Sequence, residues 1–177
     1  MWARKNANDE RSRKEARLAG LYEDYYDRIA RYIYVRIGDQ SEAEDLAGEV
    51  FLKALESLDS YKERGVPMQA WLFKIARNLL VDHLRKVSKR KIVPIDNVVV
   101  PDTSNPENEV ETRLQLKKMS EALKQLTPAQ QEVIGLRFFA GLTSDEVAKI
   151  LGKKSGAVRE MQSAAIKALR NLMHEEI

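Results

Sequence analysis

The sequence predicts an all-α protein of two small helical bundles joined by an extended linker. Apolar side chains recur at three- and four-residue steps through most of the chain, capping motifs mark helix starts, and a proline-containing stretch near the middle has no period. We therefore divide the 177 residues into a basic tail over 1–17 that need not be ordered, a first bundle over 18–91, a linker over 92–108 and a second bundle over 109–177.

The first bundle is expected to contain three helices. Apolar side chains at helical spacing from Leu18 to Ile33 form one face of the first helix. Ser41 followed by Glu44 is a capping box, which predicts the start of the second helix. Glycine and proline then interrupt the period over 61–68, which predicts a loop. A third helix follows this loop and runs into a basic segment.

The linker and the second bundle come next. The linker reads IVPIDNVVVPDTSNPEN, with three prolines and no helical stripe. A short strand at 98–100 is the alternative there, although no partner strand is evident. Leucine spacing over 114–126 predicts a helix, and local motifs mark three more. These motifs are Thr127 with Pro128 and Gln130, Thr143 with Glu146, Gly152 as a left-handed cap, and Ser155.

Composition excludes several classes of protein. The chain has no cysteine and two histidines, which excludes disulfide scaffolds, thiol nucleophiles and zinc knuckles and leaves little for a histidine-based metal site. No apolar run approaches the roughly 20 residues of a membrane span, and the charged amino end lacks the apolar stretch of a signal peptide. We therefore expect a soluble, cytoplasmic protein without a metal or cofactor.

Charges of opposite sign separate along the chain, although the net charge is only +3. Residues 39–63 carry a net charge of −6 and residues 96–111 carry −5, whereas residues 77–91 carry +5 and residues 153–170 carry +4. Two basic patches divided by an acidic stretch predict two separate contacts with a polyanion. A solvated helix face is the more common explanation of any single patch.

Residues 143–170 have the pattern of a helix-turn-helix, with a short capped helix, a glycine turn and a longer helix. In such a motif, the amino-terminal residues of the second helix enter the major groove of duplex DNA. Arg159 lies in the first turns of that helix, while Lys153, Lys154 and Ser155 lie where the turn and helix start can hold phosphate. The alternative is a plain helical hairpin with a charged outer face.

A second candidate surface surrounds the start of the third helix. Rings can stack on an unpaired base, amides can read its edge and cations can hold its phosphates. The residues that fit these roles are Tyr61, Lys62, Arg64 and Met68 in the loop, and Trp71, Lys74, Arg77, Asn78 and Arg85 in the helix. The alternatives are a tryptophan that belongs to the core and an asparagine that faces solvent.

Asp45 and Glu49 lie one turn apart on the polar side of the second helix. Like charges at this spacing destabilise an isolated helix by about 0.2–0.5 kcal/mol per pair. Two explanations are open: a solubilising surface, or a docking face for a basic protein partner.

Taken in order, these pieces resemble the small bacterial sigma factors of the extracytoplasmic-function group (ECF, group IV). Four segments carry the resemblance: LYEDYYDRIARYIYVR at 21–36, SEAEDLAGEVFLKALESL at 41–58, AWLFKIARNLLVDHLR at 70–85, and the stretch 126–172 with its LTPxQxEVIxLRF motif. The first three resemble the promoter-melting region two of that family. The last resembles its region-four helix-turn-helix.

The resemblance implies promoter recognition rather than catalysis, with core RNA polymerase and promoter DNA as partners. In such proteins the acidic helix docks on a coiled coil of the largest polymerase subunit, so the residues in or under that contact would be Asp45, Leu46, Glu49, Val50 and Phe51. The loop and third helix would bind the unpaired minus-ten strand. The final helix would read the minus-thirty-five duplex through Lys153, Lys154, Ser155, Arg159, Gln162, Ser163 and Lys167. Members of this family are commonly held by an anti-sigma protein, which the resemblance adds as a partner.

Two other functions stay open at this point. A conventional helix-turn-helix regulator would bind duplex DNA without polymerase, and a gel shift with the isolated protein would detect it. A helical enzyme would need a metal held by carboxylates and His83. The Glu-x-x-His pairs typical of such bundles are absent from the sequence.

Overall fold

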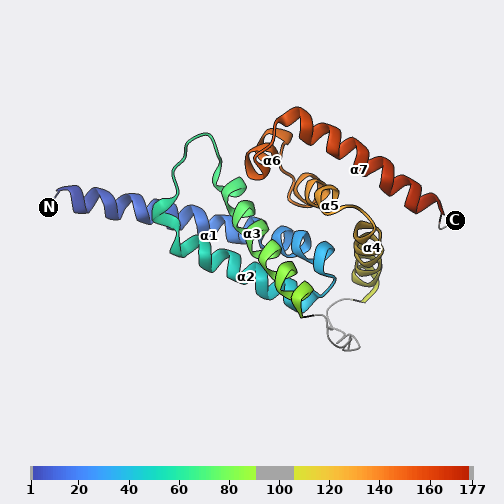
Figure 1. The fold of residues 1–177 in the computed structure, drawn as a ribbon. Helices are drawn as coiled ribbons and strands as arrows, with labels where there is room; N and C mark the ends of the chain where they lie inside the picture. The colour runs from blue at the N-terminus through green and yellow to red at the C-terminus, as the bar shows by residue number, and fades with distance from the viewer. Residues whose placement is uncertain (1, 91–105, 176–177) are drawn as a thin grey trace.

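The computed structural model describes residues 2–90 and 106–175, and within these ranges all regular secondary structure is helical, with no strand (Figure 1). The first bundle contains α1 (Trp2–Ile37), α2 (Gln40–Glu56), a 3-10 turn η1 (Leu58–Ser60) and α3 (Met68–Lys89). The second contains α4 (Pro106–Lys124), α5 (Pro128–Ile134), a π-helical segment η2 (Gly135–Phe139), α6 (Ser144–Leu151) and α7 (Ser155–Glu175). The predicted all-α class is confirmed.

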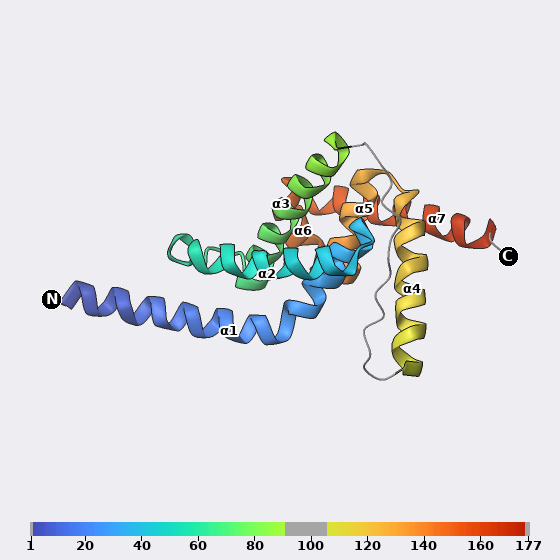
Figure 2. The ribbon, with the colours of Figure 1, turned by 90° about the horizontal axis from the view of Figure 1, so that it is seen from below.

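In the first bundle, α2 runs back along α1, and α3 crosses the pair (Figure 2). The apolar stripes face inward, as the helical spacing predicts. The rings of Tyr25 and Tyr32 on α1 meet Phe73 of α3 edge to face, with centroids 6.1 and 5.9 Å away. This geometry is favourable for aromatic pairs.

The expected tail over 1–17 differs from the structure, because α1 already begins at Trp2. Arg11, Lys14 and Arg17 recur at three-residue steps and therefore lie near one another on one side of this helix. Ion pairs anchor it: Arg11 contacts both Glu15 on its own helix, at 2.8 Å, and Asp59 in η1, at 2.5 Å. Most of the linker, the alternative strand at 98–100 included, lies outside the described residues.

Local capping motifs set most helix ends. Thr127 and Thr143 each form the predicted capping box, with Gln130 and Glu146 respectively. Gly152 ends α6 in the left-handed conformation at φ 63°, also as predicted.

The predicted start of α2 at Ser41 is wrong. Asp39 is the cap instead, and its carboxylate accepts a hydrogen bond from the Glu42 backbone N–H at 2.9 Å. Gly38, at φ 76°, turns the chain directly after α1, so the next helix begins as soon as a capping side chain is available.

The two bundles share one apolar core. Leu136, Val147 and Val158 of the second bundle are fully buried in the same cluster as Tyr32 and Phe73 of the first. A smaller cluster joins the end of α1 to the second bundle through buried Val35, which packs with Leu123, Leu126, Ile134 and Ala165. The bundles are therefore held together by direct packing in addition to the chain that connects them.

The interface is tightly packed at Gly135, where a Cβ atom would lie 2.9 Å from Cε2 of buried Tyr32. We expect Gly135→Ala to lower the free energy of unfolding by about 1–3 kcal/mol through overpacking. Thermal and urea denaturation would measure it. The control is Gly20→Ala in α1, where nothing lies within 4 Å of the added atom. A Gly135→Ala variant as stable as this control would contradict the packing described here.

Candidate functional site

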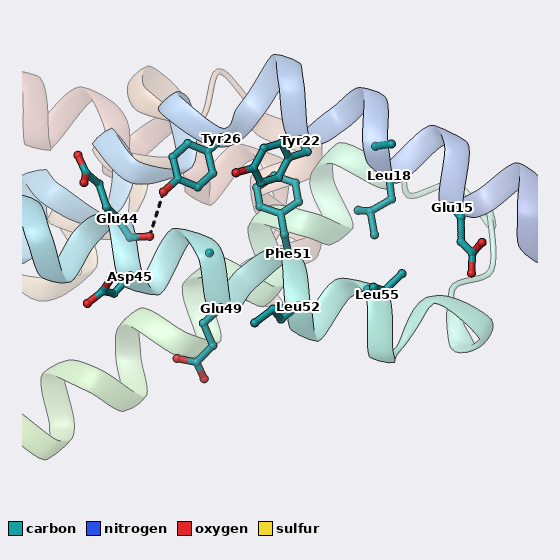
Figure 3. A pocket seen from close by; sticks show the side chains of 12 residues that line it. Glu15, Leu18, Tyr22, Tyr26, Glu44, Asp45, Glu49, Phe51, Leu52 and Leu55 are labelled. Carbon is teal, nitrogen blue, oxygen red and sulfur yellow. Dashed lines mark hydrogen bonds between the residues drawn. The ribbon is translucent and has the colours of Figure 1, made fainter.

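A groove of about 710 Å³ lies between α1 and α2 (Figure 3). Its walls are mainly apolar, and acidic side chains stand at its edges. The floor holds Phe51, whose ring meets Tyr22 edge to face with centroids 4.9 Å apart. The hydroxyl of Tyr26 donates to the backbone carbonyl of Glu44 at 3.2 Å, which joins the two helices at one end of the groove.

The residues predicted to dock a protein partner lie at or beneath this groove. Asp45 and Glu49 are exposed on its rim, and Phe51 lines its floor. Val50 is fully buried, and Leu46 is half-buried in the packing below. The prediction placed these five residues either in the docking contact or in the packing under it.

The sequence analysis missed three apolar residues of the groove. Tyr22 lies within the apolar face predicted for the first helix, but it is 48% exposed, and Leu55 of α2 is 42% exposed. Leu52 is 63% exposed, and its place on the polar side of α2 was a signal for a binding surface. Exposed apolar side chains between carboxylates suit an amphipathic helix with basic flanks.

The second candidate surface is the loop over 61–67 together with the start of α3. Trp71 is half-buried and its ring packs on Tyr61, with centroids 5.0 Å apart and planes at 42°. A pocket of about 270 Å³ adjoins both rings. The residues that line it are Ser60, Tyr61, Lys62, Val66, Ala70, Trp71 and Lys74, together with Lys149 and Ile150 of α6.

Two of the predicted loop contacts need correction. Met68 is 1% exposed and belongs to the core, so its assignment to direct DNA contact is wrong. Tyr61 is 4% exposed, and its hydroxyl donates to the Val66 carbonyl at 3.0 Å. Burial of this phenol raises its pKa. Tyr61 therefore supports Trp71 and closes the loop instead of offering its own face.

The cationic and amide residues predicted for this surface are mostly free to bind. Lys62, Arg64, Lys74, Asn78 and Arg85 are exposed. Arg77 differs, because its Nε donates to Glu132 of α5 at 2.9 Å in a partly buried ion pair. No local pattern around Arg77 indicates this partner, which lies in the other bundle.

The third surface is the helix-turn-helix of α6 and α7. Lys153, Lys154 and Arg159 are exposed at the turn and in the first turns of α7, and Arg159 donates to Ser155 Oγ at 3.1 Å. Further along α7, Ser163 and Lys167 are also exposed.

Gln162 does not match its predicted role. Its side chain is half-buried and its Oε1 accepts a hydrogen bond from Arg137 Nε at 2.7 Å. Arg137 also donates to the Leu142 carbonyl. Gln162 therefore fixes α7 to η2, and its amide oxygen is already occupied in this structure.

Across the described residues, no group of three or more His, Asp or Glu side chains is arranged to hold a metal ion. A search of the same residues for a helix long and apolar enough to cross a membrane finds none.

Comparison with protein families matches each bundle to a separate model. Residues 21–90 match Sigma-70 region 2, and residues 122–171 match Sigma-70 region 4. The first match covers the loop and all of the groove except Glu15, Leu18 and Ala19, and the second covers the helix-turn-helix.

Curated relatives carry the same family name. The chain is 36% identical over 158 residues to the ECF RNA polymerase sigma factor BldN of Streptomyces coelicolor, covering 88% of this chain and 60% of BldN. It is 30% identical over 161 residues to the ECF RNA polymerase sigma factor SigL of Mycobacterium tuberculosis, covering 90% of both chains.

Two solved structures resemble the fold. CnrH, solved with the cytosolic domain of CnrY, has a TM-score of 0.72 at 22% identity and covers 97% of this chain and 96% of that chain. The sigma factor RpoE of Bartonella quintana, solved with the anti-sigma factor NepR, has a TM-score of 0.68 at 25% identity. That match covers 88% of this chain and 96% of the other.

Proposed function

The chain belongs to the ECF RNA polymerase sigma factors, and we propose that its three surfaces divide the work of initiation among polymerase docking, capture of an unpaired strand and reading of a duplex. The observation that carries this assignment is the arrangement of the first bundle. An acidic, apolar groove and a cationic surface beside Trp71 lie on one small body. The protein acts without catalysis of its own, in the cytoplasm, where it meets the polymerase.

The groove between α1 and α2 takes part of the core polymerase. Tyr22, Leu52 and Leu55 supply apolar contact, while Asp45 and Glu49 attract basic residues of the partner. The exposed area is apolar at its centre and charged at its rim, as is usual in protein interfaces.

The loop and α3 hold the non-template strand of the minus-ten element. An unpaired base enters the pocket beside Trp71, where stacking on an aromatic ring contributes about 1–3 kcal/mol per base. Lys74 and Arg85 lie on the outer side of α3 and bind the backbone, and Asn78 between them reads a base edge.

The helix-turn-helix reads the minus-thirty-five element as duplex. Arg159 reaches base edges from the first turns of α7, and Lys153 and Lys154 hold phosphates beside it. Elements about 25 base pairs apart are separated by roughly 85 Å of B-DNA. The bundles, which share a core here, must therefore separate before both surfaces bind one promoter.

An anti-sigma protein is a further partner in this proposal. RpoE of Bartonella quintana is seen with one, NepR, and the fold of that sigma factor is similar to the fold described above. Such a protein would compete with the polymerase for the exposed groove.

In vitro transcription with core polymerase on genomic fragments tests the function. Added protein should select specific start sites. A protein that binds duplex DNA alone but gives the polymerase no selectivity would instead be a conventional helix-turn-helix regulator.

Glu49→Arg is expected to reduce co-purification with core polymerase at least tenfold, because it places a cation where the rim attracts basic residues. Pull-down with immobilised polymerase measures it. Glu56→Arg is the matched control, since Glu56 is an exposed acid of the same helix that does not line the groove. Equal loss in both variants would mean that the groove is not the docking site.

Lys74→Ala combined with Asn78→Ala should impair promoter opening while polymerase binding is unchanged. Both side chains are exposed, so folding should be unaffected. Permanganate reactivity of unpaired thymines reports opening, with Lys117→Ala, an exposed lysine of α4, as control. Normal opening by the double variant would refute the assignment of this surface.

Arg159→Ala is expected to weaken binding to the minus-thirty-five duplex by about 1–3 kcal/mol, if the side chain contacts a base with both nitrogens. Binding of the polymerase complex to labelled promoter fragments, with and without changes in that element, measures the loss. Arg31→Ala, an exposed arginine of α1, serves as control. A loss that is the same on all fragments would indicate a phosphate contact only.

A further inference from the structure

The first half of α1 contacts η1 and the loop that precedes α3 through three basic side chains. Arg11 Nη1 lies 2.5 Å from Asp59 Oδ2, and Lys14 Nζ donates to the Tyr61 carbonyl at 3.1 Å. Arg17 donates from both terminal nitrogens to the two carboxylate oxygens of Glu63, each at 3.2 Å. We call residues 2–17 the arm and residues 61–67 the base loop.

The base loop has few contacts of its own. The Tyr61 hydroxyl and the Val66 carbonyl close it, and Gly65 turns it at φ 73°. Among the described residues, side chains from other elements reach its polar groups from two sides only: the arm, and Lys149 of α6, which donates to the Gly65 carbonyl. Four of the seven loop residues, Lys62, Glu63, Arg64 and Gly65, are exposed.

The contact from α6 belongs to the second bundle. If the bundles separate on a promoter, as the proposed function requires, Lys149 leaves the Gly65 carbonyl. The arm belongs to the first bundle and stays. After Lys149 has left, the arm is the one element in the described part of the chain whose side chains still hold the loop beside the pocket.

We propose that the arm is a positioning clamp for the base loop, through which Arg11, Lys14 and Arg17 set the affinity and selectivity for the unpaired minus-ten base. This inference rests on the proposed function of that loop. Lys14 and Arg17 contact the loop, and Arg11 contacts Asp59 of η1, which lies just before the loop. In this proposal the three residues do not bind the DNA themselves, and they act through the position of Lys62 and of the ring pair of Tyr61 and Trp71.

Charge supports the same role. Asp59 and Glu63 lie next to a surface that binds phosphate, where unpaired carboxylates repel a nucleic acid. The arm neutralises these two carboxylates. The pKa of Arg11 is raised mainly by its hydrogen bond to Glu15, and the pKa of Arg17 is raised mainly by its hydrogen bonds to Glu63. Exposed ion pairs are individually weak and screened by salt, so three contacts on η1 and the base loop together should give a moderate effect.

The test compares variants in the complete complex with core polymerase, using single-stranded oligonucleotides that carry the minus-ten sequence or one changed base. Arg17→Ala should lower affinity about three- to tenfold and reduce discrimination between the two oligonucleotides. Arg13→Ala is the matched control, because Arg13 is an exposed arginine of the arm that forms no ion pair with the other described residues. Co-purification with polymerase should be unchanged in both.

Two further variants separate positioning from charge. Glu63→Gln removes a negative charge near the DNA, but it also removes the ionic hold on Arg17. A clamp predicts that Glu63→Gln weakens selective binding, whereas a purely electrostatic role predicts that it strengthens binding. The exchange of Arg17→Glu with Glu63→Arg should restore wild-type affinity to within about twofold.

The clamp is overturned if Arg17→Ala behaves like Arg13→Ala, if Glu63→Gln binds more tightly than the wild type, or if the exchanged pair fails to restore selectivity. These outcomes leave the proposed function intact as long as the wild-type complex still prefers the minus-ten oligonucleotide. A wild-type complex with no preference would defeat the proposed function and the clamp together.

Discussion

The packing of Tyr32 against Gly135 fixes how the two bundles sit on each other, and the positions of the functional surfaces depend on it. This contact brings Glu132 to Arg77 and α6 to the pocket beside Trp71. The interface also buries polar groups that have no hydrogen-bond partner among the described residues, and these include the Tyr32 hydroxyl and two guanidinium nitrogens of Arg36. Burial raises the pKa of Tyr32 and lowers that of Arg36, since each charged form is poorly solvated there. Apolar packing therefore favours the closed arrangement and polar desolvation opposes it.

Most of the fold could be predicted from the sequence because its signals are local. A capping box acts over four residues and a left-handed glycine over one, so Thr127, Thr143 and Gly152 could each be assigned without knowledge of the rest of the chain. The start of α2 was missed because Asp39 and Ser41 are both good caps, and only the turn at Gly38 decides between them. The shared core could not be predicted. Helical spacing shows which face of a helix is apolar, but it does not identify the helix that covers that face.

In the candidate site, too, local features could be predicted and long-range contacts could not. Exposed charged residues such as Lys74 and Arg159 have the predicted accessibility, because charged side chains seldom leave water. Met68 and Gln162 could not be assigned correctly, since burial in the core and a distant guanidinium determine what each of them does. The ion pair of Arg77 could not be foreseen either, because its carboxylate partner lies in the other bundle. The arm was missed because its apolar pattern is weak, and the ion pairs that hold it join residues nearly 50 positions apart.

The shared core has a kinetic consequence for how this sigma factor loads. Separation of the bundles in free solution would expose Leu136, Val147 and Phe73 to water, so the open form is rare before a partner covers it. If the polymerase selects that rare form, the observed association rate will rise with polymerase concentration and then level off at the rate of opening. If the polymerase first engages the groove, which is already exposed in the closed form, opening follows as a second step on the enzyme's surface. Tyr22, Leu52 and Leu55 lie outside the shared core, which favours docking of the polymerase before the bundles open.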